Sequence, residues 1–414
     1  TRARQNKHLV VHGDMEENTT ESQKNETGAV TLNPGQVIRP CLSANYAKQI
    51  CKELFGLKVK TIKEFNSYDD RNFHITVEEE WDNPHIKEIY KDGYMMKVLN
   101  SMDSKKTHYE GEHLAMKILD ANGINCPLPV LNIYGQESHL QRIYIEENEN
   151  EVDPQDPKFC EHKGFTENIV RLLKFVPGQI IWTVPYVPDL LYNAGKLLGK
   201  LQKCLKDFHH SEMQEFKSVW NTGYFPEVAK FVYVIKDEED NKMILDIIQA
   251  FKEQVLPVSK TLQRGVIHGD FNEQNILVKL KDGKRDEYEI CGMLDFGDMS
   301  ESCYIYEVGM AIMYLMVESK VVPFMEVGGH VLAGYLSQMR LSRQEYNLVW
   351  LCVAARYATS LTMGAYSYTM DPGNEYLLVT AKNGWPQLRK FWSTPKEEIY
   401  AMWEKVIDRY EKQT

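Results

Sequence analysis

Two short polar loops, separated by a predicted β-hairpin, constrain the fold of this chain more than any other feature. The first loop is His268-Gly269-Asp270-Phe271-Asn272-Glu273-Gln274-Asn275, and the second is Asp295-Phe296-Gly297-Asp298. Apolar residues lead into the first loop and out of it, and the polar run with Asp282-Gly283 predicts the hairpin turn. The returning strand, residues 288–294, would deliver Asp295 beside Asn275. The pattern therefore predicts one site built from two loops.

The residue types in these loops indicate phosphate transfer. The spacing H-x-D-x-x-x-x-N followed by D-F-G is a kinase signature set, and the matched pair is far more specific than either half. Asp270 is placed to orient a substrate hydroxyl and to accept its proton. Asn275 and Asp295 offer the hard oxygen ligands that Mg²⁺ prefers. His268 is expected to support the loop by hydrogen bonding, without touching the transferred proton.

Composition narrows the class of partner and the compartment. The chain has 48 basic and 59 acidic residues among 414, so its net charge of -11 argues against nucleic acid or an anionic membrane surface and favours a small cationic ligand. The eight cysteines include no C-x-x-C pair, which predicts reduced thiols in a cytoplasmic protein. The first forty residues contain no apolar export segment. The longest apolar run, Met310–Val317, is too short to span a bilayer.

The order of patterns along the chain predicts an α+β, two-lobed protein. Residues 1–40 are polar and predict a disordered N-terminal tail. Residues 41–175 favour an antiparallel sheet, with one strand over 128–134, and a helix that Ser43 would cap and Gly56 would end. Residues 176–414 are mainly helical, beginning with a long apolar stripe from Leu190 to Phe208. The first of these lobes is expected to bind nucleotide, and the second to carry catalysis and the acceptor. Between them we predict a hinge at 174–178, where backbone groups of Lys174 and Val176 would read a purine edge.

Several residues of the first lobe are candidates for nucleotide contacts. Lys97 stands in an apolar strand, where an unpaired ammonium would be costly to bury. Its partner is expected on the next helix, at Glu110 or Glu112. The turn over the nucleotide, residues 67–72, lacks glycine, so a G-x-G-x-x-G phosphate cradle is not available. The side chains of Ser67 and Asn72 would replace some of the missing backbone contacts.

Six stretches carry a resemblance to a known superfamily. They are Phe55–Val59, Ser67–His74, Val170–Leu173 with Pro177-Gly178, His268–Leu277, Leu294–Ser300 and Val327–Gly334. The chain resembles the aminoglycoside phosphotransferase and choline kinase superfamily from about Asn45 to Trp403. That resemblance implies a protein-kinase-like fold, a nucleotide donor, Mg²⁺ and a small alcohol as acceptor, and it favours Glu112 as the partner of Lys97. No A-P-E motif follows Asp298, which disfavours a protein kinase regulated by loop phosphorylation.

Within the superfamily, the stretches most resemble the branch that acts in lysine catabolism. The resemblance implies 5-hydroxy-L-lysine as acceptor and GTP as the usual donor, with ATP as the other possibility. Asp298 is our candidate for contact with this cationic amino acid, with loop capping as an equal alternative. Glu301 and Glu307 are better explained by capping, and Arg356 and His330 are possible carboxylate partners by charge alone. A kinase of another hydroxylated amine, choline-like or aminoglycoside-like, and a nucleotide-binding pseudokinase remain open, because the metal-site motifs serve the phosphate and not the alcohol.

Overall fold

The computed structural model describes residues 39–65, 67, 70–144, 165–214, 217–370 and 379–412. The chain divides into two compact units, the first made of Thr1–His108 and Pro127–Phe175 and the second of Tyr109–Cys126 and Val176–Thr414. The change from one unit to the other at Phe175 falls inside the predicted hinge. Residues 109–126, which we expected in the first lobe, group with the second unit. Nearly all of the predicted tail, residues 1–40, lies outside the described residues.

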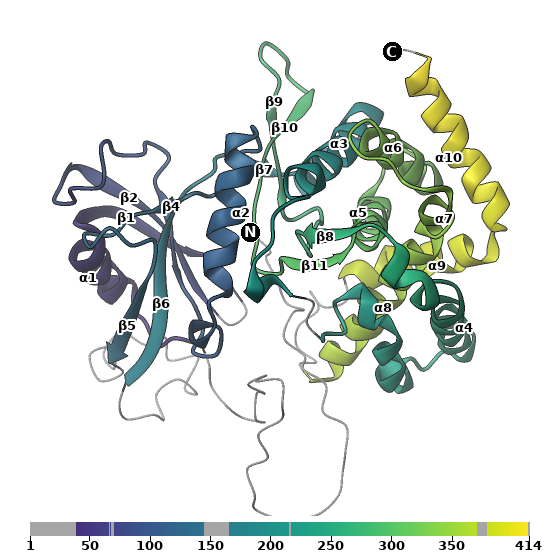
Figure 1. Ribbon diagram of the computed structural model, residues 1–414, viewed down its shortest axis with the longest axis horizontal. Coiled ribbons are helices and arrows are strands. Elements are labelled where there is room, and N and C mark those ends of the chain that lie inside the picture. Colours follow the sequence, from purple (N-terminus) through teal and green to yellow (C-terminus); the bar gives the residue numbers. More distant parts are fainter. Residues whose placement is uncertain are drawn as a thin grey trace, which may run out of the picture. The chain divides into compact units, whose positions relative to one another are not determined.

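An antiparallel sheet forms the centre of the first unit (Figure 1). Its order is β1-β2-β3-β6-β4, and β5 also pairs with β6. The strands are β1 (Leu57–Phe65), β2 (Arg71–Trp81), β3 (Tyr94–Val98), β4 (Pro129–Val130), β5 (His139–Tyr144) and β6 (Phe165–Lys174). We predicted a longer strand over 128–134. It is short because the Asn132 side chain accepts hydrogen bonds from the backbone of Tyr134 and Gln136 and folds this segment into a turn.

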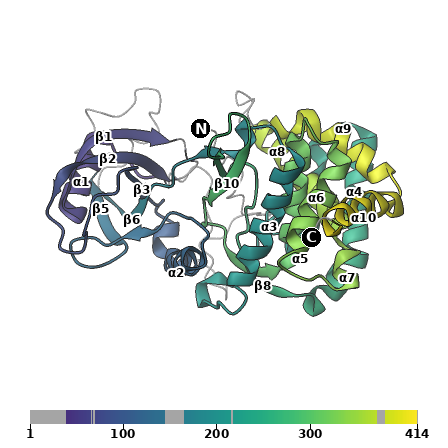
Figure 2. The same cartoon turned by 90° about the horizontal axis from the view of Figure 1, so that it is seen from above.

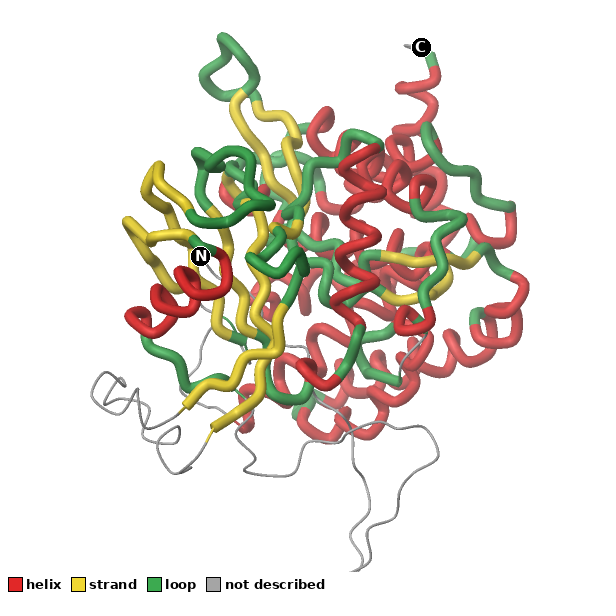
Figure 3. The backbone as a smooth tube through the Cα atoms, turned by 60° about the vertical axis from the view of Figure 1, so that its left-hand side comes forward, coloured by secondary structure: helices red, strands yellow, loops and turns green. Residues whose placement is uncertain are grey.

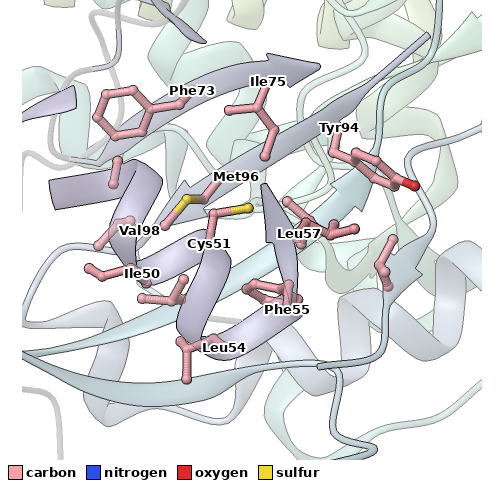
Figure 4. Close-up of a cluster of buried hydrophobic side chains, with 14 of the residues drawn as sticks. Ile50, Cys51, Leu54, Phe55, Leu57, Phe73, Ile75, Tyr94, Met96 and Val98 are labelled. Carbon is pink, nitrogen blue, oxygen red and sulfur yellow. The ribbon is translucent and has the colours of Figure 1, made fainter. Parts of the chain in front are cut away.

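Helix α1 (Ala44–Phe55) covers one face of this sheet, and its ends follow the sequence signals. The Ser43 hydroxyl accepts from the backbone N–H of Tyr46, and Gly56 ends the helix in the left-handed conformation at φ 62°. Between helix and sheet lies a buried cluster that includes Ile50 and Phe55 from α1 with Phe73 and Met96 from the strands (Figure 4). Burial of these side chains fixes which face of each strand points toward α1.

The second unit is mainly helical, as predicted (Figure 3). Its helices are α2 (His108–Ala121), α3 (Pro188–Cys204), α4 (Glu238–Gln254), α5 (Tyr304–Glu318), α6 (Phe324–Leu336), α7 (Arg343–Tyr346), α8 (Val349–Met370), α9 (Val379–Ser393) and α10 (Lys396–Glu411). Its short strands are β7 (Gln179–Ile180), β8 (Arg264–Ile267), β9 (Ile276–Leu280), β10 (Tyr288–Met293) and β11 (Ser300–Cys303). The 3₁₀ helices of the chain are η1 (Asp103–Lys105), η4 (Ile181–Thr183), η5 (Ser211–Met213), η6 (Thr222–Val234) and η7 (Leu256–Thr261).

Helices α3 and α6 pack closely because glycines stand where they cross (Figures 1 and 2). A Cβ atom on Gly195 of α3 would overlap the backbone carbonyl of Val331, and one on Gly334 of α6 would overlap that of Tyr192. The apolar stripe that predicted α3 faces this contact, with Leu191 and Leu198 buried. The two helices therefore form a rigid support for Gln202 at the end of α3.

One span, Arg343–Thr369, is long and apolar enough to cross a membrane by length and composition alone. It exceeds the run Met310–Val317 that the sequence had suggested as the longest. However, 89% of its apolar window is buried inside the protein. We therefore interpret α8 as a core helix of the second unit.

Candidate active site

Two strand pairs hold the predicted loops together at both ends. The first loop runs from β8 to β9, and the second runs from β10 to β11. Where the first loop ends and the second begins, Ile276 pairs with Met293, and the Leu294 N–H donates to the Asn275 carbonyl at 2.8 Å. At the opposite ends, Ile267 of β8 pairs with Ser300 of β11. The predicted hairpin is confirmed, and the two loops are joined to each other at both ends.

Asp270 is held at the centre of the first loop. Its side chain is 2% exposed, and its two carboxylate oxygens accept hydrogen bonds from the amide nitrogens of Asn272 and Asn275, each at 2.7 Å. A carboxylate fixed by two donors keeps one orientation without rearranging. This is the arrangement that a proton acceptor for an attacking hydroxyl needs.

His268 connects the two loops. Its Nδ1 accepts from the Asp270 N–H at 3.2 Å, so its Nε2 carries the proton and donates to the Leu294 carbonyl at 2.9 Å. The ring is fully buried and stands edge-on to Phe296, with 4.9 Å between centroids. These contacts support the loops, which is the role that we predicted for His268.

Asn275 and Asp295 have the chemistry of ligands for a hard cation. The Asn275 amide nitrogen gives both of its hydrogen bonds to Asp270, so its carbonyl oxygen is the end that remains for a metal. Asp295 has φ 69°, the only left-handed conformation at a non-glycine in the described part of the chain, and such strain is typical of functional sites. Within the described ranges, no group of three or more His, Cys, Asp or Glu side chains could hold a metal. Two protein oxygens fit Mg²⁺, which takes most of its ligands from water and phosphate.

Glu307 supports the first loop through a hydrogen bond to its backbone, a role that the sequence did not reveal. It is fully buried on α5, where its Oε1 accepts from the Gly269 N–H at 2.8 Å and its Oε2 accepts from the Gln202 amide at 3.0 Å. The Tyr335 hydroxyl in turn donates to Gln202 at 2.7 Å. The pKa of Glu307 is raised to about 7, mainly by burial and to a smaller extent by the charge of Asp270, while the hydrogen-bond donors limit the rise. Both carboxylate oxygens of Glu307 are therefore engaged inside the protein, which agrees with the structural role that we preferred for this residue.

Gly269 lets the two loops touch. It has φ 78°, and a Cβ atom there would overlap the backbone carbonyl of Asp298. Asp298 itself is half-buried beside this contact. Its predicted role toward the acceptor stays a prediction.

In the first unit, Lys97 lies on the sheet face opposite α1. It follows the buried Met96 on β3, so its side chain points to the other face, in register with Asn72 on β2 and Arg171 on β6. Arg171 was not singled out from the sequence, although it is a second cation beside Lys97. The Asn72 carbonyl oxygen Oδ1 is buried and has no hydrogen-bond partner in the described part of the protein. This face therefore gathers two cations and a polar group.

The predicted phosphate turn is described only in part. Ser67 is half-buried just after β1, whereas Asn66, Tyr68 and Asp69 lie outside the described residues. The carboxylate of Asp70 accepts from the backbone and side-chain nitrogens of Asn100, at 2.8 and 3.1 Å. Its charge is thus engaged within the first unit.

Burial separates the two candidate partners of Lys97. On α2, Glu112 is 5% exposed and Glu110 is exposed. A buried carboxylate requires a partner far more than an exposed one. Burial therefore favours Glu112, as the resemblance did, and the ion pair itself stays a prediction.

The hinge residues differ in what their backbones can offer. The Lys174 N–H donates to the Leu128 carbonyl at 2.8 Å, and the Phe175 N–H donates to the Gly93 carbonyl at 3.1 Å. The Lys174 ammonium lies 5.5 Å from the Tyr90 ring centroid. The Lys174 N–H is thus engaged within the first unit, and the purine contact by the backbone at the hinge stays a prediction.

Comparison with known proteins assigns the chain to a family. The model of the phosphotransferase enzyme family matches residues 61–341, more than half of the chain. The chain belongs to this family. The predicted resemblance is confirmed, and this phosphotransferase is a small-molecule kinase whose acceptor is a hydroxyl group.

Two relatives match the phosphotransferase over almost their whole length. Hydroxylysine kinase of Xenopus laevis is 32% identical over 381 residues, which cover 90% of this chain and 96% of the relative. Hydroxylysine kinase of Bos taurus is 31% identical over 384 residues, with 90% and 95% covered.

Solved structures share its fold at low sequence identity. Amicoumacin kinase hAmiN, in complex with AMP-PNP, Ca²⁺ and Ami, has a TM-score of 0.56 at 13% identity and covers 89% of this chain and 94% of its own. The microcompartment-associated aminopropanol kinase has a TM-score of 0.55 at 15% identity, covering 83% and 95%. The predicted kinase-like α+β fold is confirmed.

Replacing Asp270 by asparagine tests the proton acceptor. The variant keeps the shape of the side chain but loses the base, so we expect kcat to fall by about 10²- to 10⁴-fold while nucleotide binding changes little. Steady-state kinetics and calorimetry measure the two effects. Glu289→Gln, the same acid-to-amide change at a half-buried residue of β10, is the control and should keep normal turnover. Near-normal turnover of Asp270→Asn would exclude the role.

Replacing Asp295 by alanine tests the metal site. Loss of a carboxylate ligand should abolish turnover and remove most of the Mg²⁺ dependence of nucleotide binding. Calorimetric titration of the nucleotide with and without Mg²⁺ measures this. Asp286→Ala, in the exposed turn of the hairpin, should keep the metal dependence of the unmodified protein. The ligand role is wrong if Asp295→Ala keeps it too.

The Glu112→Gln and Glu110→Gln variants test the ion pair. Only Glu112→Gln should reproduce the effect of Lys97→Met, a loss in kcat/KM for the nucleotide of roughly 10- to 100-fold, as expected for one charge-assisted hydrogen bond. Initial-rate kinetics with varied nucleotide measure the loss. Equal behaviour of the two glutamine variants would contradict the assignment of Glu112.

Proposed function

We propose that this phosphotransferase moves the terminal phosphate of GTP to the hydroxyl of 5-hydroxy-L-lysine in the cytoplasm, with ATP as an alternative donor. The observation that supports the acceptor is similarity to hydroxylysine kinases over almost the full length of both chains, 90% and 96% for the Xenopus laevis protein. Similarity confined to the metal-site motifs would not favour one alcohol over another, because those motifs serve the phosphate.

The proposed reaction uses the fixed carboxylate of Asp270. The substrate hydroxyl donates its proton to Asp270 while its oxygen attacks the terminal phosphorus, and the bond to the nucleoside diphosphate breaks. Asn275 and Asp295 would hold Mg²⁺, which when bound neutralises charge on the phosphate oxygens. His268 forms hydrogen bonds with both loops, and Glu307 accepts one from the Gly269 N–H. These bonds keep the first loop in place.

The donor would bind through residues of the first unit and the hinge. Lys97 would hold the phosphates, with Glu112 as its partner and with Asn72 beside it in register. Ser67 would contribute from the phosphate turn. At the hinge, the Val176 backbone would read the purine edge, with Lys174 next to it.

The positive charge of the acceptor agrees with the negative charge of the protein. Hydroxylysine carries two ammonium groups, and a net charge of -11 favours the approach of a cation. Asp298, half-buried against Gly269, is our candidate for contact with one of these ammonium groups.

An acceptor panel tests the proposed function. Purified protein with Mg²⁺ and either GTP or ATP is offered 5-hydroxy-L-lysine, choline, kanamycin or L-lysine, and phosphorylated product is measured by mass spectrometry. We expect hydroxylysine to be phosphorylated far more efficiently than choline or kanamycin, with GTP preferred, and no product from L-lysine because it lacks the hydroxyl. Asp270→Asn is the matched inactive control.

Other outcomes of the panel contradict the proposal in distinct ways. Phosphorylation of choline or kanamycin in place of hydroxylysine would keep the mechanism and replace the acceptor. Nucleotide binding without turnover of any acceptor would favour the pseudokinase.

A further inference from the structure

Arg356 is a buried cation whose partners in the protein are neutral. It lies on α8 and is 2% exposed. One terminal nitrogen donates to the Trp220 carbonyl at 2.9 Å and the other to the Tyr314 hydroxyl at 3.1 Å. Within the described ranges no carboxylate lies at salt-bridge distance from it, and its Nε is buried without a hydrogen-bond partner. Because arginine stays charged, burial without a counter-ion is costly, and the fold has not supplied one.

Arg389 in the same unit shows the ordinary arrangement. Its Nε and one terminal nitrogen donate to the two carboxylate oxygens of Asp240, at 2.7 and 2.6 Å. This pair forms although half of the Arg389 side chain is exposed. Of these two arginines, the more deeply buried Arg356 is therefore the one without a carboxylate partner.

Two aromatic rings fix the orientation of the Arg356 guanidinium. Its central carbon lies 5.4 Å from the Trp220 ring centroid and 5.2 Å from that of Tyr314. Stacked rings hold a planar guanidinium in place, and a preorganised fork suits two-point binding of a carboxylate.

The arginine cluster lies near the catalytic loop. Tyr314, on α5, is half-buried, and desolvation of its phenol raises its pKa. The charge of Arg356 opposes this rise in pKa, while the carboxylates of Asp270 and Glu273 add to it. Glu273 belongs to the first loop and accepts at its backbone carbonyl from Trp182 at 3.2 Å. The Trp182 indole donates to Glu318, at the end of α5, at 3.0 Å. Loop, α5 and the guanidinium on α8 are therefore connected through a short series of contacts.

Several buried polar atoms around this cluster lack hydrogen-bond partners in the described part of the protein. They are the Nε of Arg356, the indole nitrogen of Trp220, the hydroxyl of Tyr186 and the Oε2 of Glu273. Tyr186 is 2% exposed, and burial raises the pKa of its phenol. Burial also raises the pKa of the Glu273 carboxyl, to about 8, so the described residues do not fully compensate the charge of this group. Buried polar groups normally have partners, so these four mark a place for a polar ligand with both an anionic and a cationic end.

We propose that Arg356, oriented by Tyr314 and Trp220, binds the carboxylate of the acceptor, and that Glu273 receives one of its ammonium groups. The proposal rests on the proposed function and deepens it, because it makes a free amino acid with a hydroxyl group the substrate class. An acceptor without a carboxylate, such as choline or an aminoglycoside, would leave the Arg356 charge uncompensated. Selection against such amines then follows from the cost of that buried charge.

The other candidate for the carboxylate, His330, is engaged elsewhere. Its Nδ1 is hydrogen-bonded to the Tyr410 hydroxyl at 2.7 Å, and Tyr410 donates to the Pro188 carbonyl at 3.1 Å. Burial lowers the pKa of His330, which disfavours the charged form of the ring. His330 is therefore a weaker candidate than Arg356 for a carboxylate.

Ligand binding tests the proposal without requiring turnover. L-Lysine has both ammonium groups and the carboxylate of the proposed acceptor, and 1,5-diaminopentane has the same ammonium groups without the carboxylate. Calorimetry should show that Arg356→Met weakens L-lysine binding by about 10- to 100-fold, the loss expected for a charge-assisted pair, while diamine binding changes less than about threefold. Arg356→Lys, which keeps the charge but loses the fork, should fall between. Arg389→Met is the matched control and should leave the preference for L-lysine unchanged.

Turnover provides the second readout. The unmodified protein should prefer 5-hydroxy-L-lysine to 1,5-diaminopentan-2-ol, its analogue without the carboxylate. Arg356→Met should remove this preference while nucleotide affinity, which also reports correct folding, stays unchanged. If Arg356→Met does not fold, Arg356→Lys makes the same comparison.

Each outcome decides the proposal. Equal losses for both ligands, unchanged L-lysine binding in the Arg356 variants, or no L-lysine binding by the unmodified protein would overturn it. If L-lysine binding depends on Arg356 but hydroxylysine is not phosphorylated, the carboxylate site stands and the proposed function fails. If hydroxylysine is phosphorylated with the same preference in Arg356→Met, the proposed function stands and the carboxylate site fails.

Discussion

The structure of the second unit depends on tying two loops together at all four of their ends. Pairing of β9 with β10 joins the loops on one side, and pairing of β8 with β11 joins them on the other. The hydrogen bond from His268 to the Leu294 carbonyl adds a link between these ends. A phosphotransferase gains from this rigidity, because its catalytic groups contribute mainly by position and charge.

The surrounding helices bury charged side chains, which lowers the stability of the fold unless partners compensate. Glu307 is fully buried, and the fold offsets the cost with donors from Gly269 and Gln202. Gln202 is held in turn by the close packing of α3 on α6, which the glycines at 195 and 334 allow. Arg356 makes two hydrogen bonds and two ring contacts with the described residues, but it receives no counter-charge from them. Unrelieved cost of this kind is expected where a ligand completes the interaction, as we propose for the acceptor carboxylate.

In the first unit, the two faces of the sheet have different roles. Packing of α1 fixes Phe73 and Met96 on one face. The alternation of a strand then places Asn72 and Lys97 on the other face, in register with each other. The hydrophobic core thereby orients the proposed nucleotide contacts, although none of its members belongs to them.

The sequence alone was sufficient for features that arise from short-range patterns. The two loops and the hairpin between them follow from motif spacing and one turn, and α1 follows from its periodicity and from the caps Ser43 and Gly56. Helix α4 was not foreseen, and strand β4 came out shorter than predicted because Asn132 draws the following residues into a turn. These differences are local, and they do not change the position of the site.

Only the tertiary structure decided which distant residues support or complete the site. Glu307 meets Gly269 across 38 residues, and Arg356 meets Tyr314 across 42 and Trp220 across 136. From charge alone, the sequence could not show that Glu307 and not Glu301 supports the first loop. It also could not distinguish Arg356 from His330 as the candidate for the acceptor carboxylate. Periodicity tells which face of a helix is buried, but the partner of a buried charge depends on how several helices pack around it. That packing is set by the summed shapes of many side chains, so no local pattern in the sequence records it.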